Sequence, residues 1–354
     1  MIHVSATYIE SYRISYPFEY DFHIKASIVY NSFSRFAVPG FLMLSGAFLL
    51  QNDKNKEFRR FYRKSFVKLG VPTIIFTVIY FLYTVVLNSI LNYPHVDIIK
   101  SIILSVKQTL RGVPYYHMWY MYALIGIYAF IPIIIRLRND IGEKAFKKVS
   151  YIVFAVTILS GMTSNNYIQW SITNSVSHIG YVMIGYVIKT DLEKKKDNKK
   201  GVCLIVLSLI CYLGFSLFRF PVIINRVIID TNFENYSAVD YFAVSGTFSP
   251  IASIAAVALF AGISLFEIKS GRFERISKKV FYIYLFHAGV WDALSRIFFG
   301  KILNGLTDPV YTILIMMIIV FLVSYILSVV YCTIFDMINK KYRLTNRICR
   351  LFHL

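Results

Sequence analysis

Residues 310–335 read VYTILIMMIIVFLVSYILSVVYCTIF and contain no charged side chain. An α-helix of about 20 apolar residues crosses the hydrocarbon core of a bilayer. A helix also satisfies the backbone hydrogen bonds within the segment, which a chain in lipid requires. This stretch therefore predicts a transmembrane helix, and the polar residues 336–354 after it predict a tail outside the membrane.

Uncharged runs of comparable length recur along the chain. Only 16% of the 354 residues are charged and 57% are hydrophobic, whereas soluble domains carry about 25% charged residues. The run 149–188 is too long for one helix, and the polar stretch GMTSNNYIQWSITNS (161–175) divides it in two. We therefore expect an all-α, polytopic transmembrane helix bundle that forms a single domain over residues 1–354. Its nine full spans are 36–50, 69–93, 118–135, the two halves of 149–188, 201–218, 251–266, 280–298 and 310–335.

The basic residues indicate which loops face the cytoplasm. The net charge is +19, and Lys and Arg gather in short segments between the spans. Segment 51–68 holds seven of them and 336–354 holds five, whereas 161–177 holds none. By the positive-inside rule we expect a multi-pass cell-membrane protein with a basic cytoplasmic tail at 336–354. No basic–aromatic module typical of nucleic-acid binding is present, so nucleic acid is not an expected partner. The four cysteines form no CxxC pair, and no metal site is predicted.

The N-terminus does not fit this sidedness. Nine spans with the C-terminus inside place residue 1 outside, with about 30 residues to export ahead of the first full span. A preceding tenth span removes the difficulty. We therefore interpret MIHVSA (1–6) as the outer end of a truncated first helix, and residues 1–32 as this helix stub with an outer loop.

Two polar stretches lie where spans are expected to meet the outer face. In SRFAVPGFLMLSGAFLL (34–50), Arg35 is either a headgroup anchor whose charged end reaches water or a functional cation facing the bundle interior. In PYYHMWYMYALIGIYAFIPII (114–134), the aromatic side chains are either interfacial belt residues or a surface on which a sugar stacks. The candidates in this second stretch are His117, Trp119 and Tyr122.

A third stretch, KKVFYIYLFHAGVWDALSRIFFG (278–300), contains a histidine near mid-span. An unpaired polar group is costly there, so His287 either hydrogen-bonds a neighbouring helix or lines a path through the bundle. Asp292 and Arg296 follow at i and i+4 on one helix face, and we expect them to neutralise each other.

Two classes of membrane protein fit these features. One is a transporter or flippase for a polysaccharide precursor or lipid-linked sugar. The other is a transferase that takes an activated donor from the cytosol and modifies an acceptor at the membrane or outside. Transporters often contain internal repeats with helices broken at matching positions. The two halves of this sequence show no convincing repeat, which favours the transferase.

The three stretches together resemble the acyltransferase 3 family of integral membrane O-acyltransferases. Residues 34–50 look like the family's SR-x-x-VP-x-FFMISG helix, and 115–134 are similar to its YHLWF…YL-x-P-I helix. VFYIYLFHAGV (280–290) is similar to its S-x-GIY-x-x-H helix. The resemblance points especially to the branch that acetylates bacterial surface polysaccharides such as enterobacterial common antigen. Order and spacing agree over nearly the whole chain.

The resemblance implies ten helices and a set of roles. The family's first helix carries an arginine near the cytoplasm and a histidine about ten residues later. His3 looks like this histidine, which would act as the base or as a transient acyl carrier. The arginine has no counterpart here, so a truncated, inactive relative is a further alternative. Arg35 would stabilise the negative charge that develops during transfer, while His117, Trp119, Tyr122 and His287 would line the acceptor or acyl path.

The resemblance also implies a donor and an acceptor. An acetyl or similar short acyl group would move from acyl-coenzyme A, as a substrate rather than a bound cofactor, to a hydroxyl of a cell-surface or lipid-linked glycan. A basic segment, RRFYRKSFVKLGVP (59–72), either pairs with the phosphates of acyl-coenzyme A or only determines topology. Its basic residues are Arg59, Arg60, Arg63, Lys64 and Lys68.

Overall fold

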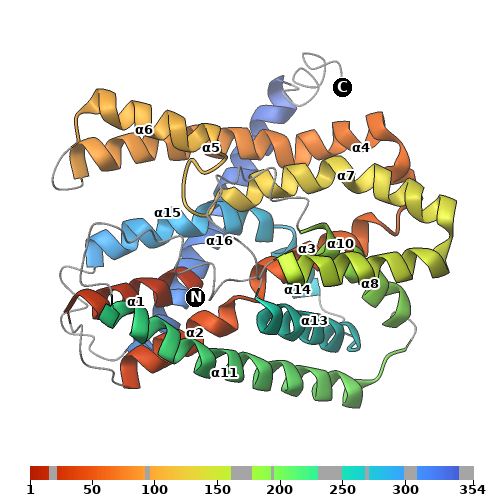
Figure 1. The fold of residues 1–354 in the computed structure, drawn as a ribbon. Helices are drawn as coiled ribbons and strands as arrows, with labels where there is room; N and C mark the ends of the chain where they lie inside the picture. The colour runs from red at the N-terminus through yellow and green to blue at the C-terminus, as the bar shows by residue number, and fades with distance from the viewer. Residues whose placement is uncertain are drawn as a thin grey trace. The chain divides into compact units, whose positions relative to one another are not determined.

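The computed structural model describes residues 1–15, 22–91, 96–160, 178–192, 195–229, 249–267, 271–298 and 309–342. Every regular element within these ranges is a helix, which confirms the predicted all-α class (Figure 1). The helices are α1 (Ile2–Ser15), α2 (Phe22–Ser34), α3 (Ala37–Leu49), η1 (Asp53–Lys56), α4 (Phe58–Ser65), η2 (Phe66–Gly70), α5 (Val71–Val86), η3 (Leu87–Leu91), α6 (Ile98–Leu110), α7 (Trp119–Ile141), α8 (Glu143–Ser160), α10 (Ile179–Leu192), α11 (Asn198–Ile229), α13 (Pro250–Ser264), α14 (Gly271–Ser277), α15 (Val280–Phe298) and α16 (Pro309–Tyr342).

Five helical segments of the described chain are long and apolar enough to cross a membrane. They support the predicted membrane protein, whereas the total of nine or ten spans stays a prediction. The polar stretch 161–175 and the end of the basic tail lie outside the described residues. The five segments are Phe22–Leu49, Phe58–Ile90, Trp119–Ile141, Asn198–Leu217 and Val310–Lys340.

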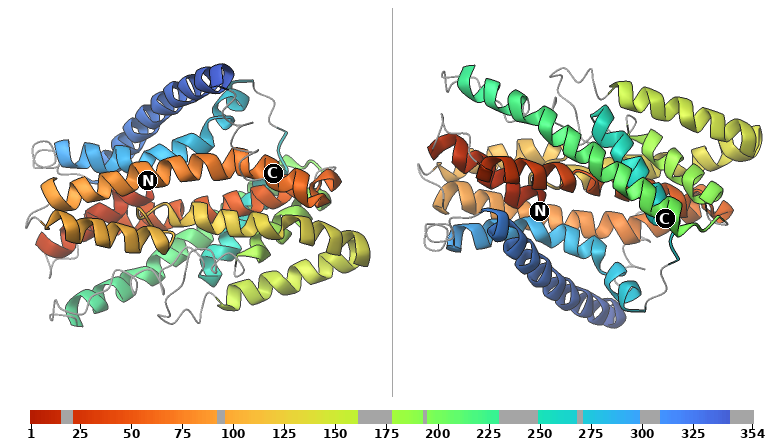
Figure 2. Two further views of the ribbon diagram at one scale, coloured as in Figure 1. Left: turned by 90° about the horizontal axis from the view of Figure 1, so that it is seen from above. Right: turned by 90° about the horizontal axis from the view of Figure 1, so that it is seen from below.

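The chain divides into two compact units. The first consists mainly of Met1–Phe41 and Ile188–Phe335, and the second mainly of Leu42–Ser160 and Asn165–Val187. In the first unit, α11 packs against both α2 and α13, and α2 packs against α1 (Figure 1). In the second unit, α6 lies alongside α5, as Figure 2 also shows.

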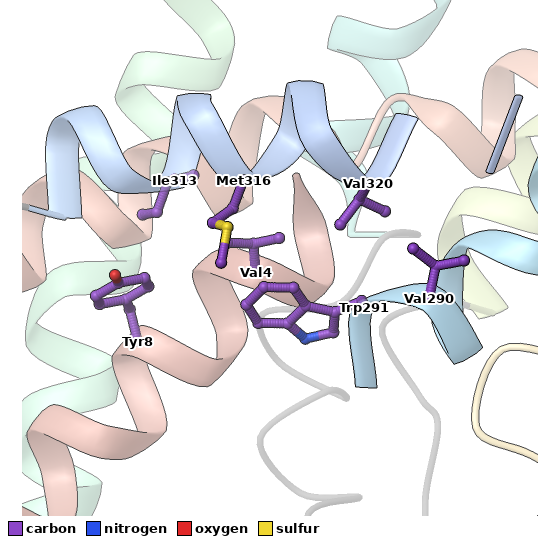
Figure 3. Close-up of a cluster of buried hydrophobic side chains, with 7 residues drawn as sticks. All are labelled: Val4, Tyr8, Val290, Trp291, Ile313, Met316 and Val320. Carbon is purple, nitrogen blue, oxygen red and sulfur yellow. The ribbon is translucent and has the colours of Figure 1, made fainter. Parts of the chain in front are cut away.

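A buried apolar cluster joins three helices of the first unit (Figure 3). Burying a large apolar side chain stabilises the fold by about 1.5–3 kcal/mol where water is the alternative, and in lipid close packing takes over this role. The cluster therefore fixes how α1 and α15 face each other. Its members are Val4 and Tyr8 from α1, Val290 and Trp291 from α15, and Ile313, Met316 and Val320 from α16.

Two glycines of the second unit allow α3 and α10 to approach closely. A Cβ atom on Gly46 would lie 1.7 Å from the carbonyl oxygen of Val182, and one on Gly185 would lie 2.1 Å from that of Met43. Small residues serve this purpose in membrane helix pairs, because they let backbones come into contact.

The N-terminal region differs from the expected stub and loop. Helix α1 continues to Ser15 rather than ending at residue 6, and α2 occupies Phe22–Ser34, where most of its length was expected to be loop. The candidate span accordingly begins at Phe22, not at residue 36. The reason is that α2 contains several hydroxyl and amide side chains, which are satisfied inside the bundle and do not mark a loop.

Candidate functional site

The two candidate histidines, His3 and His287, lie next to each other in the first unit. Their ring centroids are 5.2 Å apart and the ring planes are inclined by 31°. Val4 follows His3 and Val290 lies three residues after His287, so the buried cluster shared by α1 and α15 brings the two rings together. Sequence reasoning put His3 near the outer face and His287 at mid-span; the structure brings the two to the same level of the bundle.

A backbone carbonyl determines the tautomer of His287. Its Nδ1 atom lies 2.5 Å from the carbonyl oxygen of Tyr284, one helical turn earlier. A carbonyl oxygen only accepts, so Nδ1 carries the hydrogen and donates it. In the neutral ring, Nε2 then holds the lone pair, which is the form required of a base or nucleophile.

Further along α15, the expected pairing of Asp292 with Arg296 is confirmed. The Nε atom of Arg296 donates to Oδ2 of Asp292 at 2.8 Å. The two charges therefore offset each other on the same helix, one turn beyond the histidine pair.

Arg35 lies inside the Phe22–Leu49 segment rather than at its outer mouth. Pro39 has no N–H, and its ring would clash with the carbonyl of Arg35 four residues earlier, so the helix is interrupted at Arg35 and Phe36. The next backbone bond, from Gly40 N to Phe36 O at 2.8 Å, resumes the ladder in α3. Arg35 is only 3% exposed, which contradicts the headgroup-anchor alternative because an anchor keeps its charged end in water.

The guanidinium of Arg35 is held by an amide that sequence reasoning missed. Its Nε and Nη2 atoms donate to Oδ1 of Asn31 at 3.2 and 2.9 Å. Arg219 from α11 donates to the same oxygen, and it is also fully buried. The expected span 201–218 ends just before Arg219, whereas helix α11 continues past this residue. Its position directly after the apolar run 201–218 is the signal that could have identified it, because charges embedded in apolar helices are costly and usually functional.

The aromatic candidates form a different group, in the second unit. His117 is 2% exposed, and its ring lies edge-on to Tyr80 with the centroids 4.9 Å apart. The indole of Trp119 lies 6.3 Å from the ring of His178, and the hydroxyls of Tyr122 and Thr77 are hydrogen-bonded at 2.8 Å. The ring packing accounts for His117 as a buried structural residue, so its place on an acceptor path stays a prediction.

The five basic residues proposed to bind the donor all have exposed side chains. All five lie on the continuous helical segment formed by α4 and η2, within the Phe58–Ile90 candidate span. A set of solvated cations on a helix surface can bind phosphate groups or fix topology. The residues are Arg59, Arg60, Arg63, Lys64 and Lys68. Among the described residues, no group of three or more His, Cys, Asp or Glu side chains is placed to hold a metal ion.

The described part of the chain combines helices long and apolar enough to cross a membrane with a histidine pair and two buried arginines. The model of the acyltransferase 3 family, described as an acyltransferase domain, matches residues 1–329. The chain therefore belongs to this family and is a membrane acyltransferase. No curated protein and no solved structure matches it.

Proposed function

We propose that this protein transfers an acetyl or similar short acyl group from acyl-coenzyme A to a hydroxyl of a cell-surface or lipid-linked glycan. The observation that carries the proposal is the pair of adjacent imidazoles, His3 and His287, within a member of an acyltransferase family. Acyl transfer to a hydroxyl requires a base near neutrality, and imidazole is the side chain whose ordinary pKa meets this requirement.

The chemistry assigns one step to each group. His3 removes the proton of the acceptor hydroxyl while the oxygen attacks the thioester carbonyl. The carbon–sulfur bond then breaks, the thiolate of coenzyme A leaves, and the imidazolium returns the proton to it. The positive charge of Arg35 stabilises the negative charge on the carbonyl oxygen. His287 lies beside His3, and its Nδ1 contact with Tyr284 leaves the lone pair on Nε2. In this proposal that lone pair accepts a hydrogen bond or a proton from the reacting groups.

The exposed cations of α4 and η2 supply the binding site for the phosphates of the donor in this proposal. Charge-assisted hydrogen bonds contribute about 1.5–3 kcal/mol each, and a guanidinium can bind phosphate through two of them. We keep the C-terminus and this segment on the cytoplasmic side, where acyl-coenzyme A is present, in agreement with the positive-inside pattern.

Neutralising three of these cations tests whether they bind the donor or only determine topology. The triple variant Arg59→Gln/Arg60→Gln/Arg63→Gln is expected to raise the KM for acyl-coenzyme A at least tenfold with little change in kcat, because about 1.4 kcal/mol of lost binding corresponds to tenfold. The control is Lys195→Gln/Lys199→Gln, which removes two exposed cations outside α4 and η2. Steady-state kinetics of the purified protein in lipid nanodiscs measures both. Equal KM values in the two variants would contradict the donor site and leave only the topological role.

The proposed activity is tested by the ester content of surface glycans together with transfer in vitro. We expect O-acyl groups to disappear from a deletion strain and to return on complementation. We also expect the purified protein to move a radiolabelled acetyl group from acetyl-coenzyme A to a glycan extract from that strain. If glycan or precursor amounts change while ester content stays the same, the acyltransferase proposal fails and a transporter takes its place.

A further inference from the structure

We infer that Asn31 and Arg219 are positioning residues, which orient Arg35 and the helical turn that carries His3 for acyl transfer. The inference rests on the proposed function and adds two residues to its machinery. Both side chains are buried, Asn31 with no exposed surface and Arg219 with 1% exposed.

The amide of Asn31 has only one possible orientation. Its Nδ2 donates to the backbone oxygen of Ile2 and to Oγ of Ser5, each at 3.1 Å. Its Oδ1 accepts from the guanidinium of Arg35. The Ile2 carbonyl cannot donate and the guanidinium cannot accept, so a flipped amide would lose both sets of bonds. Because Ile2 and Ser5 flank His3 on α1, Asn31 connects the histidine turn directly to Arg35.

Arg219 also bonds Asn31 and its neighbour Ser32. Its Nη1 donates to Oγ of Ser32 at 2.8 Å, and Nη1 and Nη2 both lie 3.3 Å from Oδ1 of Asn31. The planar fork of an arginine suits such contact with two acceptors. The Asn31 oxygen is thus fixed between two guanidiniums, so the direction of Arg35 depends on Arg219 as well as on Asn31.

The packing of α2 on α11 does not depend on Arg219 alone. Phe33 and Phe36 pack against a buried cluster that contains Tyr212 and Phe215, and the rings of Phe33 and Tyr212 are 5.8 Å apart. Removing the guanidinium therefore leaves an apolar contact between the helices. We expect Arg219 variants to fold while Arg35 loses its fixed orientation.

The first test separates turnover from binding. Arg219→Gln is expected to lower kcat about tenfold, with the KM values for acetyl-coenzyme A and acceptor unchanged within twofold. A buried matched pair on α2 provides the second variant and its control. The hydroxyls of Ser27 and Ser32 each bond the carbonyl four residues earlier, at 2.9 and 2.8 Å, but in the part of the chain that the structure describes only Ser32 accepts from Arg219. Ser32→Ala should lower kcat severalfold, and Ser27→Ala should leave it unchanged.

The second test asks whether Arg219 acts through Arg35. In an Arg35→Lys background, which already lacks the guanidinium, Arg219→Gln should cause little further loss, because residues that act as a unit are not additive. Additive losses, or equal effects of Ser27→Ala and Ser32→Ala, would overturn the inference. If Arg219→Gln does not fold, the serine pair decides alone. If the wild-type protein has no turnover with acetyl-coenzyme A, the proposed function itself has failed and this inference falls with it.

Discussion

His287→Ala is expected to reduce acyl transfer about a thousandfold, within the range that general acid–base catalysis supplies. The reason is the loss of the Nε2 lone pair beside His3, with which it shares a ring contact of 5.2 Å. His3→Ala should have an effect of the same size. The double variant should be little worse than either single one, because the two imidazoles act as a unit. Turnover of labelled acetyl-coenzyme A by purified protein measures these effects.

A second substitution at the same position separates chemistry from packing. In His287→Asn the side-chain amide can still donate to the Tyr284 carbonyl, whereas nothing replaces Nε2. We expect His287→Asn to fold normally and to be as inactive as His287→Ala. His23→Ala, which removes a half-buried histidine of α2, is the control and should retain activity. If His287→Asn keeps more than a tenth of the wild-type turnover, His287 only anchors a helix and has no catalytic role.

Gly46→Ala and Gly185→Ala are expected to cause the largest losses of folded protein. The added methyl group would overlap a backbone carbonyl oxygen of the facing helix, at 1.7 Å from Val182 or 2.1 Å from Met43. Backbone atoms cannot rotate away as a flexible side chain does, so α3 and α10 must separate. Overpacking costs about 1–3 kcal/mol and occasionally more, even where side chains can adjust. Most of the protein should therefore be lost from the monodisperse peak in size-exclusion chromatography.

The matched control for these glycines is Gly214→Ala. Gly214 lies on α11, and a Cβ atom there would meet nothing within 4 Å. This variant should elute and melt like the wild type. If Gly46→Ala and Gly185→Ala behave as Gly214→Ala does, then α3 and α10 do not approach as closely as described.

The all-α class was predicted correctly from the sequence. A long uncharged run is suited to lipid, and a segment in lipid must form a helix to satisfy its backbone hydrogen bonds. The rule failed at Phe22–Ser34, because Lys25 and Arg35 interrupt the uncharged run although Asn31 and Ser32 lie in a buried helix. Besides their partners on α1 and α2, Asn31 and Ser32 accept from Arg219 of α11, and such a long-range contact leaves no local pattern. The motifs around His3 and His287 identified both residues as candidates. Their adjacency depends on the α1–α15–α16 cluster, which no single segment contains.

The surroundings of His117, Arg35 and Arg219 also depend on contacts that a single segment of sequence does not show. The sequence around His117 fitted an interfacial belt and a sugar-stacking surface equally well, and its ring contacts with Tyr80 and Tyr115 were not visible in the sequence. The sequence showed that Pro39 would interrupt the helix at Arg35. How deep in the membrane Arg35 lies could not be predicted, because it depends on where the span begins. Arg219 lies just beyond the expected span 201–218 because the uncharged-run rule ends a span at the first cation.

The bond between Arg219 and Asn31 also has a consequence for biosynthesis. The two residues are 188 positions apart, and most of the second unit is synthesised between them. At about 5–20 residues per second, α11 emerges from the ribosome roughly 10 to 40 s after α2. During this interval Arg35 has only its local amide partner among these contacts, and the nascent chain lacks the second guanidinium. The contact between Arg219 and Asn31 can therefore form only late in translation, after most of the second unit has been synthesised.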